Sequence, residues 1–513
     1  MKIYFASVFL FFSFILVRAE VRLPDILGDS MVLQQKQAVP IWGWANAGET
    51  VTVKFGKQTK TAIADANGKW RVDLQNLKAS YTAQTLTIEA TNKIELNNIL
   101  VGEVWLVAGQ SNMQRLLRET SNGDEVQSKA NSPNIRLFNV SRDVAFKKKA
   151  GKLGEWQPTT PESVKEFSAA GFYFGLEMEK ALKVPIGLIN SSYGGSQAEA
   201  WTPVAYLTAN PELKPTVDRT QIWAEERPRV KIEYDAAIAK WREDSEKQKS
   251  VGAKPSPSPG VPDALRDYRV ASSIYDGMIE PLMPFAVKGA IWYQGESNEA
   301  RAEQYNILLP TMIRAWRERW GAGNFPFGII QLPNYRKINI EPEDAPWSFI
   351  REAQRKTALN TVNTGLIVTI DIGEANDIHP KNKLDVGKRM AVWALKDVYG
   401  VKLADSPKFH KAETKNDKII LTFTGVGAGL KIKDGAKLDE FAIAGADKKF
   451  VWADAKIVGK NKIEVSSAAV KNPLAVRYAF NSNPRNPNLT NDSNLPAAPF
   501  RTDDWNDPTA GKR

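Results

Sequence analysis

Four segments of the chain carry side chains that could catalyse the hydrolysis of an ester. Each segment follows a short apolar run of the kind that forms a buried strand. Together they supply a serine, a pair of glycines, an amide beside a carboxylate, and an Asp-Ile-His sequence. The segments are Gly109–Met113, Ser191–Trp201, Gln294–Asn298 and Glu374–Pro380. A nucleophile, donors to an oxyanion, a general base and an orienting acid are the groups that a serine esterase needs.

Each of these residues also has a structural interpretation. Ser111 could cap a helix, since a serine before a helix satisfies free N–H groups. The pair Gly194–Gly195 could form a turn with positive φ, while Gln294 and Glu296 could be hydrogen-bonded polar residues at a strand end. The positions of these residues after predicted strands favour a catalytic role, because ligands gather at the carboxyl ends of the strands in an open parallel sheet.

The histidines supply the sharpest argument, because the chain has only two, His379 and His410. A serine esterase needs a base that titrates near neutral pH, and histidine fills that role most often. His410 lies among lysines at the start of a predicted β region, where we expect it to be exposed. His379 lies in a loop after a predicted strand, two residues beyond Asp377. If the protein is a Ser–His enzyme, the base is His379.

The composition excludes several other kinds of site. The chain of 513 residues contains no cysteine, which rules out thiol catalysis and thiolate metal sites. Two histidines are too few for a multi-histidine zinc site, and we expect neither a metal nor an organic cofactor. The formal charge of +11 arises from 69 basic and 58 acidic residues without a long basic tract. A mildly basic surface is therefore a better interpretation than a nucleic-acid site.

The first residues have the pattern of a targeting segment. A basic start at Met1–Lys2 is followed by an apolar run over residues 3–17 and then by the small residue Ala19. The run is short for a membrane span and long enough for the core of a signal peptide. We therefore expect a signal peptide at residues 1–19, with export to the periplasm or the medium; a retained anchor is the alternative. No other run in the sequence approaches the length of a membrane span.

The rest of the chain divides into three parts. Residues 20–100 show short alternating runs between turns, which predicts a small β-sandwich. Residues 101–400 alternate short apolar runs with amphipathic stretches, which predicts an α/β domain with a mostly parallel sheet. Within this part, residues 205–265 are charged and Pro/Ser-rich and should form a solvent-facing helical insertion. Residues 401–513 return to a β pattern, which predicts a second β domain with a tail.

The four segments, in their order and spacing, resemble the blocks of the sialate O-acetylesterase family. This family is a branch of the SGNH hydrolases, which also include acetylesterases that act on xylan and other carbohydrates. The resemblance extends to "ILGDSMVLQQ" near the start and "AAPFRTDDW" near the end, so it covers nearly the whole mature chain. It implies a three-layer α/β/α domain with a mostly parallel sheet, flanked by β-sandwich-like domains on both sides.

The resemblance also implies roles for individual residues. Ser111 matches the nucleophile, and its own N–H would be one donor to the oxyanion. Gly194 or Gly195 would supply a second N–H, and Gln294 would donate from its side-chain amide. His379 matches the base.

The acid that orients the histidine has more than one candidate. Asp377 is the first choice, although this chain spaces the acid and the histidine as Asp-x-His where Asp-x-x-His is usual in the wider group. Glu296 and Asp371 are the alternatives. Glu296 and Asn298 are also expected to support the site from the third segment.

These observations predict an exported serine esterase that removes O-acetyl groups from carbohydrate, foremost from position 9 of sialic acid. An acetyl xylan esterase with the same machinery is one alternative. A carbohydrate-binding protein with an inactive hydrolase core is another, although an inactive core has no reason to retain the whole set of chemical groups. The expected partner is an O-acetylated sialic acid or polysaccharide, with no nucleic acid and no membrane span once the signal peptide is removed.

Overall fold

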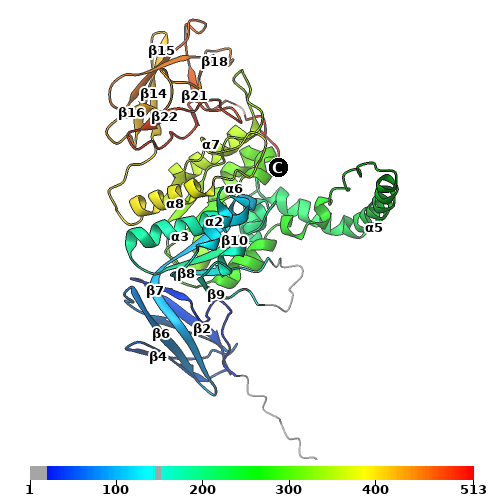
Figure 1. Cartoon of the computed structure of the whole chain (residues 1–513), viewed down its shortest axis with the longest axis vertical. Helices are drawn as coiled ribbons and strands as arrows, with labels where there is room; N and C mark the ends of the chain where they lie inside the picture. Colours follow the sequence, from blue (N-terminus) through cyan, green and yellow to red (C-terminus); the bar gives the residue numbers. More distant parts are fainter. Residues whose placement is uncertain (1–19, 143, 145–151, 506) are drawn as a thin grey trace, which may run out of the picture.

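The computed structural model describes residues 20–142, 144, 152–505 and 507–513. The signal peptide expected at residues 1–19 lies outside this range. Three regions follow one another along the chain: strands at the N-terminal end, a central sheet with helices, and further strands toward the C-terminus (Figure 1). The central region contains the four segments that carry the candidate chemical groups.

A mostly parallel sheet forms the middle of the molecule. Its strands are ordered β13–β12–β11–β7–β10–β8–β9, and every neighbouring pair is parallel except β8 with β9. Strands β10 and β11 are buried along their whole length, as strands covered on both faces should be. The bounds are β7 (Lys93–Gly109), β8 (Ser132–Asn139), β9 (Trp156–Thr159), β10 (Ile186–Ser192), β11 (Gly289–Tyr293), β12 (Phe327–Ile330) and β13 (Thr364–Ile367).

Four long helices pack in two pairs against this sheet. Helix α3 (Ala169–Leu182) contacts α8 (Lys383–Asp397), and α6 (Ala302–Trp320) contacts α7 (Pro346–Asn360). Both α7 and α8 also contact β12 and β13. Each long helix buries an apolar stripe, which is the pattern that predicted amphipathic helices between strands. The predicted α/β class is confirmed.

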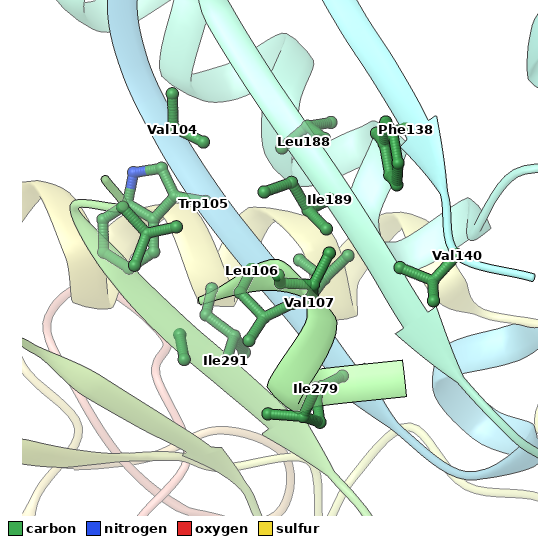
Figure 2. Packing of buried hydrophobic residues seen from close by; sticks show 14 of the residues in the cluster. Val104, Trp105, Leu106, Val107, Phe138, Val140, Leu188, Ile189, Ile279 and Ile291 are labelled. Atoms are coloured by element: carbon green, nitrogen blue, oxygen red, sulfur yellow. The ribbon is translucent and has the colours of Figure 1, made fainter. Parts of the chain in front are cut away.

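The apolar core behind the strand ends is closely packed (Figure 2). Trp105 and Val107 of β7, Leu188 of β10 and Ile291 of β11 have no exposed surface. The Trp105 ring packs edge-on against Phe174 of α3, with the ring centroids 5.4 Å apart. Because a close-packed interior allows little movement, the loops that leave these strands start from fixed points.

Strand β7 belongs to two sheets. Its earlier residues pair with β1 (Val32–Gln34) and β6 (Ser80–Glu89), and its later residues pair with β10 and β11. The boundary expected after residue 100 therefore falls inside one continuous strand, which runs from the N-terminal strands into the central sheet (Figure 1). The other N-terminal strands are β2 (Val39–Trp44), β3 (Thr50–Phe55), β4 (Gln58–Ile63) and β5 (Lys69–Leu74).

The C-terminal strands form small antiparallel sheets. Two have four strands, in the orders β14–β15–β20–β19 and β18–β17–β21–β23, and a third pairs β16 with β22. His410 lies on β14 and is exposed, as expected. The bounds are β14 (Lys408–Lys415), β15 (Lys418–Thr424), β16 (Leu430–Ile432), β17 (Phe441–Ala444), β18 (Val451–Trp452), β19 (Asp454–Ile457), β20 (Lys462–Ser466), β21 (Ala475–Tyr478), β22 (Leu489–Asn491) and β23 (Phe500–Arg501).

A long charged helix interrupts the alternation of strands and helices. After the short helix α4 (Val204–Thr208), α5 (Lys214–Ser250) runs for 37 residues and projects away from the body of the molecule (Figure 1). Ion pairs one turn apart, such as Arg229 with Glu233, line its exposed surface. Among the residues that the structure describes, no helix is both long enough and apolar enough to cross a membrane.

Candidate active site

Ser111 begins the short helix α1 (Ser111–Gln114) directly after β7, in a turn that requires glycine. Gly109 has a φ of +142°, and a Cβ added to it would lie 2.2 Å from the carbonyl oxygen of Tyr293. The end of β11 therefore lies against this turn, and a side chain at position 109 would force the two apart. Gln110, rather than Ser111, occupies the N-cap position of α1. Helix capping thus does not explain the serine.

His379 lies beside Ser111, although 268 positions separate them in the chain. The distance between His379 Nε2 and Ser111 Oγ is 2.8 Å. Both side chains are partly exposed, so a substrate can reach them from solvent. A ring nitrogen at hydrogen-bonding distance from a hydroxyl is the geometry in which a base can take the hydroxyl proton.

The surroundings of His379 favour its neutral form. Burial lowers the pKa of its imidazole from the usual 6.5, and the positive charge of Arg115 lowers it further, while Asp377 acts in the opposite direction. Since only a neutral imidazole can accept a proton, this lowered pKa keeps the ring able to act as a base at neutral and mildly acidic pH.

Asp377 is the acid that lies nearest to the ring. Its Oδ1 accepts a hydrogen bond from the backbone N–H of His379 at 2.8 Å, so the loop bends back between the two residues. The same oxygen is 3.7 Å from His379 Nδ1, which is ion-pair distance rather than hydrogen-bond distance. Asp371 is held by Arg389 at 2.6 Å and 2.9 Å, while Glu296 accepts from Asn112 at 2.6 Å. No hydrogen bond joins either of these alternatives to His379.

Of the two glycines, Gly194 is the one that lies against the serine. A Cβ added to Gly194 would be 3.4 Å from Ser111 Cβ, whereas one added to Gly195 would meet the ring of Tyr268. The backbone N–H of Gly194 donates to Gln114 Oε1 at 2.7 Å, so an oxygen atom already lies next to this N–H. Gly195 has a φ of +74° and provides the turn after Gly194.

Gln294 and Asn298 do not face Ser111 but bind each other. Gln294 Nε2 donates to Asn298 Oδ1 at 2.7 Å and to the carbonyl oxygen of Ser196 at 3.2 Å, which uses both amide hydrogens. Asn298 Nδ2 donates in turn to Glu199 at 2.8 Å. The predicted donation from Gln294 to an oxyanion is therefore not supported, because no N–H of this fully buried amide remains for it.

Part of the chain matches a known protein family. Residues 101–226 and 260–396, more than half of the chain, match the family described as "Carbohydrate esterase, sialic acid-specific acetylesterase". The chain belongs to this family. A carbohydrate acetylesterase from Xanthomonas citri is 35% identical with a TM-score of 0.78, over 94% of this chain and 100% of that chain. The sialate O-acetylesterase of Homo sapiens is 27% identical over 93% of this chain and 92% of that protein, and that of Rattus norvegicus is 28% identical over 78% and 79%.

As a member of this carbohydrate esterase family, the protein is a carboxylic ester hydrolase. The four segments chosen from the sequence all lie within the matched residues, and the structure brings Ser111, His379, Asp377 and Gly194 together. Membership confirms the predicted resemblance. The strand pairing confirms the predicted additional β sheets beside the α/β core.

The candidate site contains two further residues that the sequence did not single out, Asn112 and Lys383. Lys383 Nζ donates to Asn112 Oδ1 at 2.8 Å, and both side chains are buried. One signal was available in the sequence: Lys383 falls on the inward stripe of α8 together with Val386 and Met390, where a lysine is unusual. A charged residue in an apolar stripe needs buried partners, which points to a polar site.

Proposed function

We propose that the protein is an exported serine esterase that removes O-acetyl groups from carbohydrate, with Ser111 as the nucleophile and His379 as the base. The observation that carries this proposal is the 2.8 Å separation of His379 Nε2 from Ser111 Oγ at the carboxyl end of β7. Asp377 would stabilise the imidazolium that forms when the ring accepts a proton, since its carboxylate is 3.7 Å from Nδ1.

The reaction would proceed in two halves. Ser111 Oγ bonds to the acetyl carbonyl carbon while its proton passes to His379 Nε2, and the imidazolium then returns that proton to the departing sugar oxygen as the ester bond breaks. A water molecule gives a proton to His379 in the second half, its oxygen attacks the acetyl-enzyme, and acetate leaves as the proton returns to Ser111. Each half uses the same Ser–His contact.

Backbone donors would bind the oxyanion. The N–H of Gly194 lies beside Ser111 and donates to Gln114 Oε1 at 2.7 Å. We propose that the carbonyl oxygen of the acetyl group takes the place of this amide oxygen, so that Gly194 N–H and Ser111 N–H stabilise the negative charge. This assignment keeps the two backbone donors expected from the sequence, omits Gln294, and chooses Gly194 over Gly195.

An aromatic pair beside the glycines supports a carbohydrate substrate. Tyr193, which directly precedes Gly194, stacks on Tyr268 with ring centroids 4.8 Å apart and an interplanar angle of 23°. Both rings are partly exposed, and Tyr268 also lies against Gly195. Their apolar faces and hydroxyl groups offer a surface on which a sugar ring can lie. We propose 9-O-acetylated sialic acid as the first substrate, in keeping with the names of the curated relatives, and acetylated xylan as the second.

Acetate release tests this proposal. The purified protein should release acetate from 9-O-acetylated sialic acid faster than from acetylated xylo-oligosaccharides or from butyryl and octanoyl esters with one common leaving group. The Ser111→Ala variant is the control for acetate that arises without the enzyme. Preference for the octanoyl ester, or no release from any acetylated sugar, would contradict the proposed function.

Export is a separate proposal that is based only on the first 19 residues. The sequence pattern there favours cleavage after the small residue Ala19. Mass spectrometry of the protein recovered from its natural host should find a mature N-terminus at or near Glu20. A chain that retains Met1–Lys2 and fractionates with membranes would favour the anchor instead.

A further inference from the structure

We infer that Lys383 is a positioning residue of the esterase site, which acts together with Asn112 to hold the loop of His379 at hydrogen-bonding distance from Ser111. This inference rests on the proposed roles of His379 and Ser111. Lys383 would be the group that fixes the distance between His379 and Ser111.

Two buried side chains hold the histidine loop from both sides. Lys383 Nζ donates to the carbonyl oxygen of Pro380 at 2.6 Å, and Asn112 Nδ2 donates to the carbonyl oxygen of Ile378 at 3.0 Å. These carbonyls belong to the residues immediately before and after His379. The backbone on each side of the base is therefore anchored by a side chain, and a movement of the loop would break one of these bonds.

The same two side chains connect the loop to the nucleophile. Asn112 follows Ser111 directly in α1, and Lys383 Nζ donates to Asn112 Oδ1 at 2.8 Å. Asn112 is 1% exposed and Lys383 is 0% exposed, so water does not compete for these bonds. The connection runs from the serine turn through Asn112 and Lys383 to the histidine loop, and it does not pass through solvent.

A buried carboxylate completes the network. Asn112 Nδ2 also donates to Glu296 Oε1 at 2.6 Å, while Glu296 Oε2 has no hydrogen-bond partner among the described residues. Burial lowers the pKa of Lys383 to about 7, against the attraction of Glu296, and burial raises the pKa of Glu296 above its usual range. A buried ammonium is costly, so its retention next to the base needs a reason other than packing.

The charge of Lys383 also acts on the base. The charged groups that face His379 are Arg115 and Lys383, which lower the pKa of its imidazole, and Asp377 and Glu119, which raise it. Lys383 carries its proton below about pH 7, where His379 titrates. Removal of the ammonium should therefore raise the pKa of His379, a shift that can be measured independently of any change in stability.

The test compares Lys383→Met with Lys388→Met, which changes an exposed lysine of the same helix. Steady-state hydrolysis of a soluble acetyl ester should show kcat lowered about 100-fold in Lys383→Met, because a misplacement of about 1 Å costs that much, with KM changed less than threefold. The acid limb of kcat/KM should move to higher pH. Lys388→Met should match the wild type in all three quantities.

Several outcomes would overturn the inference. A folded Lys383→Met enzyme with kcat within threefold of wild type and an unmoved acid limb would exclude a positioning role. If this variant does not fold, Lys383→Gln replaces it, since a polar side chain is better tolerated among the same acceptors. Failure of both to fold would assign Lys383 to stability alone. An inactive wild-type protein would instead reject the proposed function, so the two failures are distinguishable.

Discussion

Two polar clusters lie at the carboxyl ends of neighbouring strands, and they differ in how completely their hydrogen-bonding groups are satisfied. The reactive cluster comprises Ser111, His379 and Asp377. The second, which we call the Glu199 cluster, lies deeper and is paired throughout. Its members are Glu199, Arg219, Arg301, Asn298 and Gln294.

Glu199 shows what a structural carboxylate looks like in this molecule. It is 1% exposed and is bound by Arg219 at 3.0 Å, Arg301 at 2.5 Å and Asn298 at 2.8 Å. Burial raises its pKa, but the two arginines and the amide outweigh burial and hold the pKa below its usual value. A group with every acceptor occupied cannot take part in a reaction without breaking the fold.

Asp377 and His379, in contrast to Glu199, are partly exposed and not fully hydrogen-bonded. The side chains of both are about one third exposed, at 37% and 30%, and the 3.7 Å between Asp377 Oδ1 and His379 Nδ1 leaves a hydrogen bond still to be made. Catalytic hydrogen bonds are often long in a free enzyme and shorten when substrate binds. Of the two clusters, the less satisfied and more exposed one is therefore the one that we assign to chemistry.

The substitution Ser111→Ala should distinguish the two clusters most clearly, because it should abolish activity without changing stability. Loss of the nucleophile should lower kcat on the order of a thousandfold or more, because only binding and oxyanion stabilisation remain. The thermal melting curve should be unchanged, since the serine hydroxyl does not cap α1. Hydrolysis of an acetyl ester and thermal unfolding measure the two quantities. Activity within tenfold of wild type would mean that the reactive cluster is misassigned.

The two histidines permit an equally large but internally controlled comparison. His379→Ala should lose activity to the same extent as Ser111→Ala, because the base and the nucleophile act as a unit. His410→Ala should retain full activity, since His410 is exposed on β14. Steady-state hydrolysis of one acetyl ester by both variants is sufficient. An essential His410 would contradict the site described above.

Glu199→Gln should affect stability far more than chemistry. The substitution leaves Arg219 and Arg301 without their buried counter-charge, and breaking a buried ion pair costs about 3–5 kcal/mol in the free energy of unfolding. Glu225→Gln, on the exposed surface of α5, is the matched control and should unfold like the wild type. Denaturant unfolding and activity per folded molecule are the measurements. A stable but inactive Glu199→Gln protein would show that Glu199 belongs to the reactive cluster.

The sequence predicted the reactive cluster better than the Glu199 cluster, for a physical reason. Ser111 and His379 follow the parallel strands β7 and β13, and parallel strands bring their carboxyl ends to one edge whatever the details of packing. The partner of the Gln294 amide depends instead on which acceptor lies within 3 Å after the helices have packed. Asn298 fills that place, from only four residues away, and nothing in their spacing reveals it.

The extent of β7 and the role of Lys383 also differ from what the sequence predicted, for physical reasons. The alternation of apolar runs was sufficient to predict a parallel sheet, because burial on both faces imposes that pattern directly. It could not show that β7 continues through residue 100 into a second sheet, since the mostly apolar run that starts at Ile99 has the same pattern in either sheet. Lys383 was missed because its place on the apolar stripe of α8 indicates burial but not its partners, Asn112 and the carbonyl oxygen of Pro380.

Substitution of the orienting acid should lower kcat less than loss of the serine or the base. Asp377→Asn keeps the shape of the side chain and its bond from His379 N–H but removes the charge near Nδ1. We expect kcat to fall about tenfold to a hundredfold with little change in melting temperature. Asp371→Asn should instead lower the melting temperature, because Asp371 binds Arg389. Near wild-type turnover in Asp377→Asn, beside a folded but inactive Glu296→Gln, would make Glu296 the orienting acid.

The smallest expected effect is a displacement of the pH profile in Arg115→Met. Burial and the guanidinium of Arg115 together lower the pKa of His379 from 6.5, so kcat/KM should be fully developed at neutral pH and fall only as the pH drops below 6.5. Removal of the guanidinium should raise this pKa, which moves the acid limb to higher pH. The loss of its contacts with Asp377 at 3.9 Å and Glu119 at 3.5 Å acts in the same direction, because both carboxylates then favour the imidazolium more strongly. Because the Arg115 side chain is 24% exposed, added salt should reduce the difference between the variant and the wild type.

Arg118→Met, which changes an exposed arginine paired with Glu166, is the control and should leave the acid limb of kcat/KM in place. An acid limb that moves to lower pH in Arg115→Met would show that Arg115 does not act on His379 through its charge.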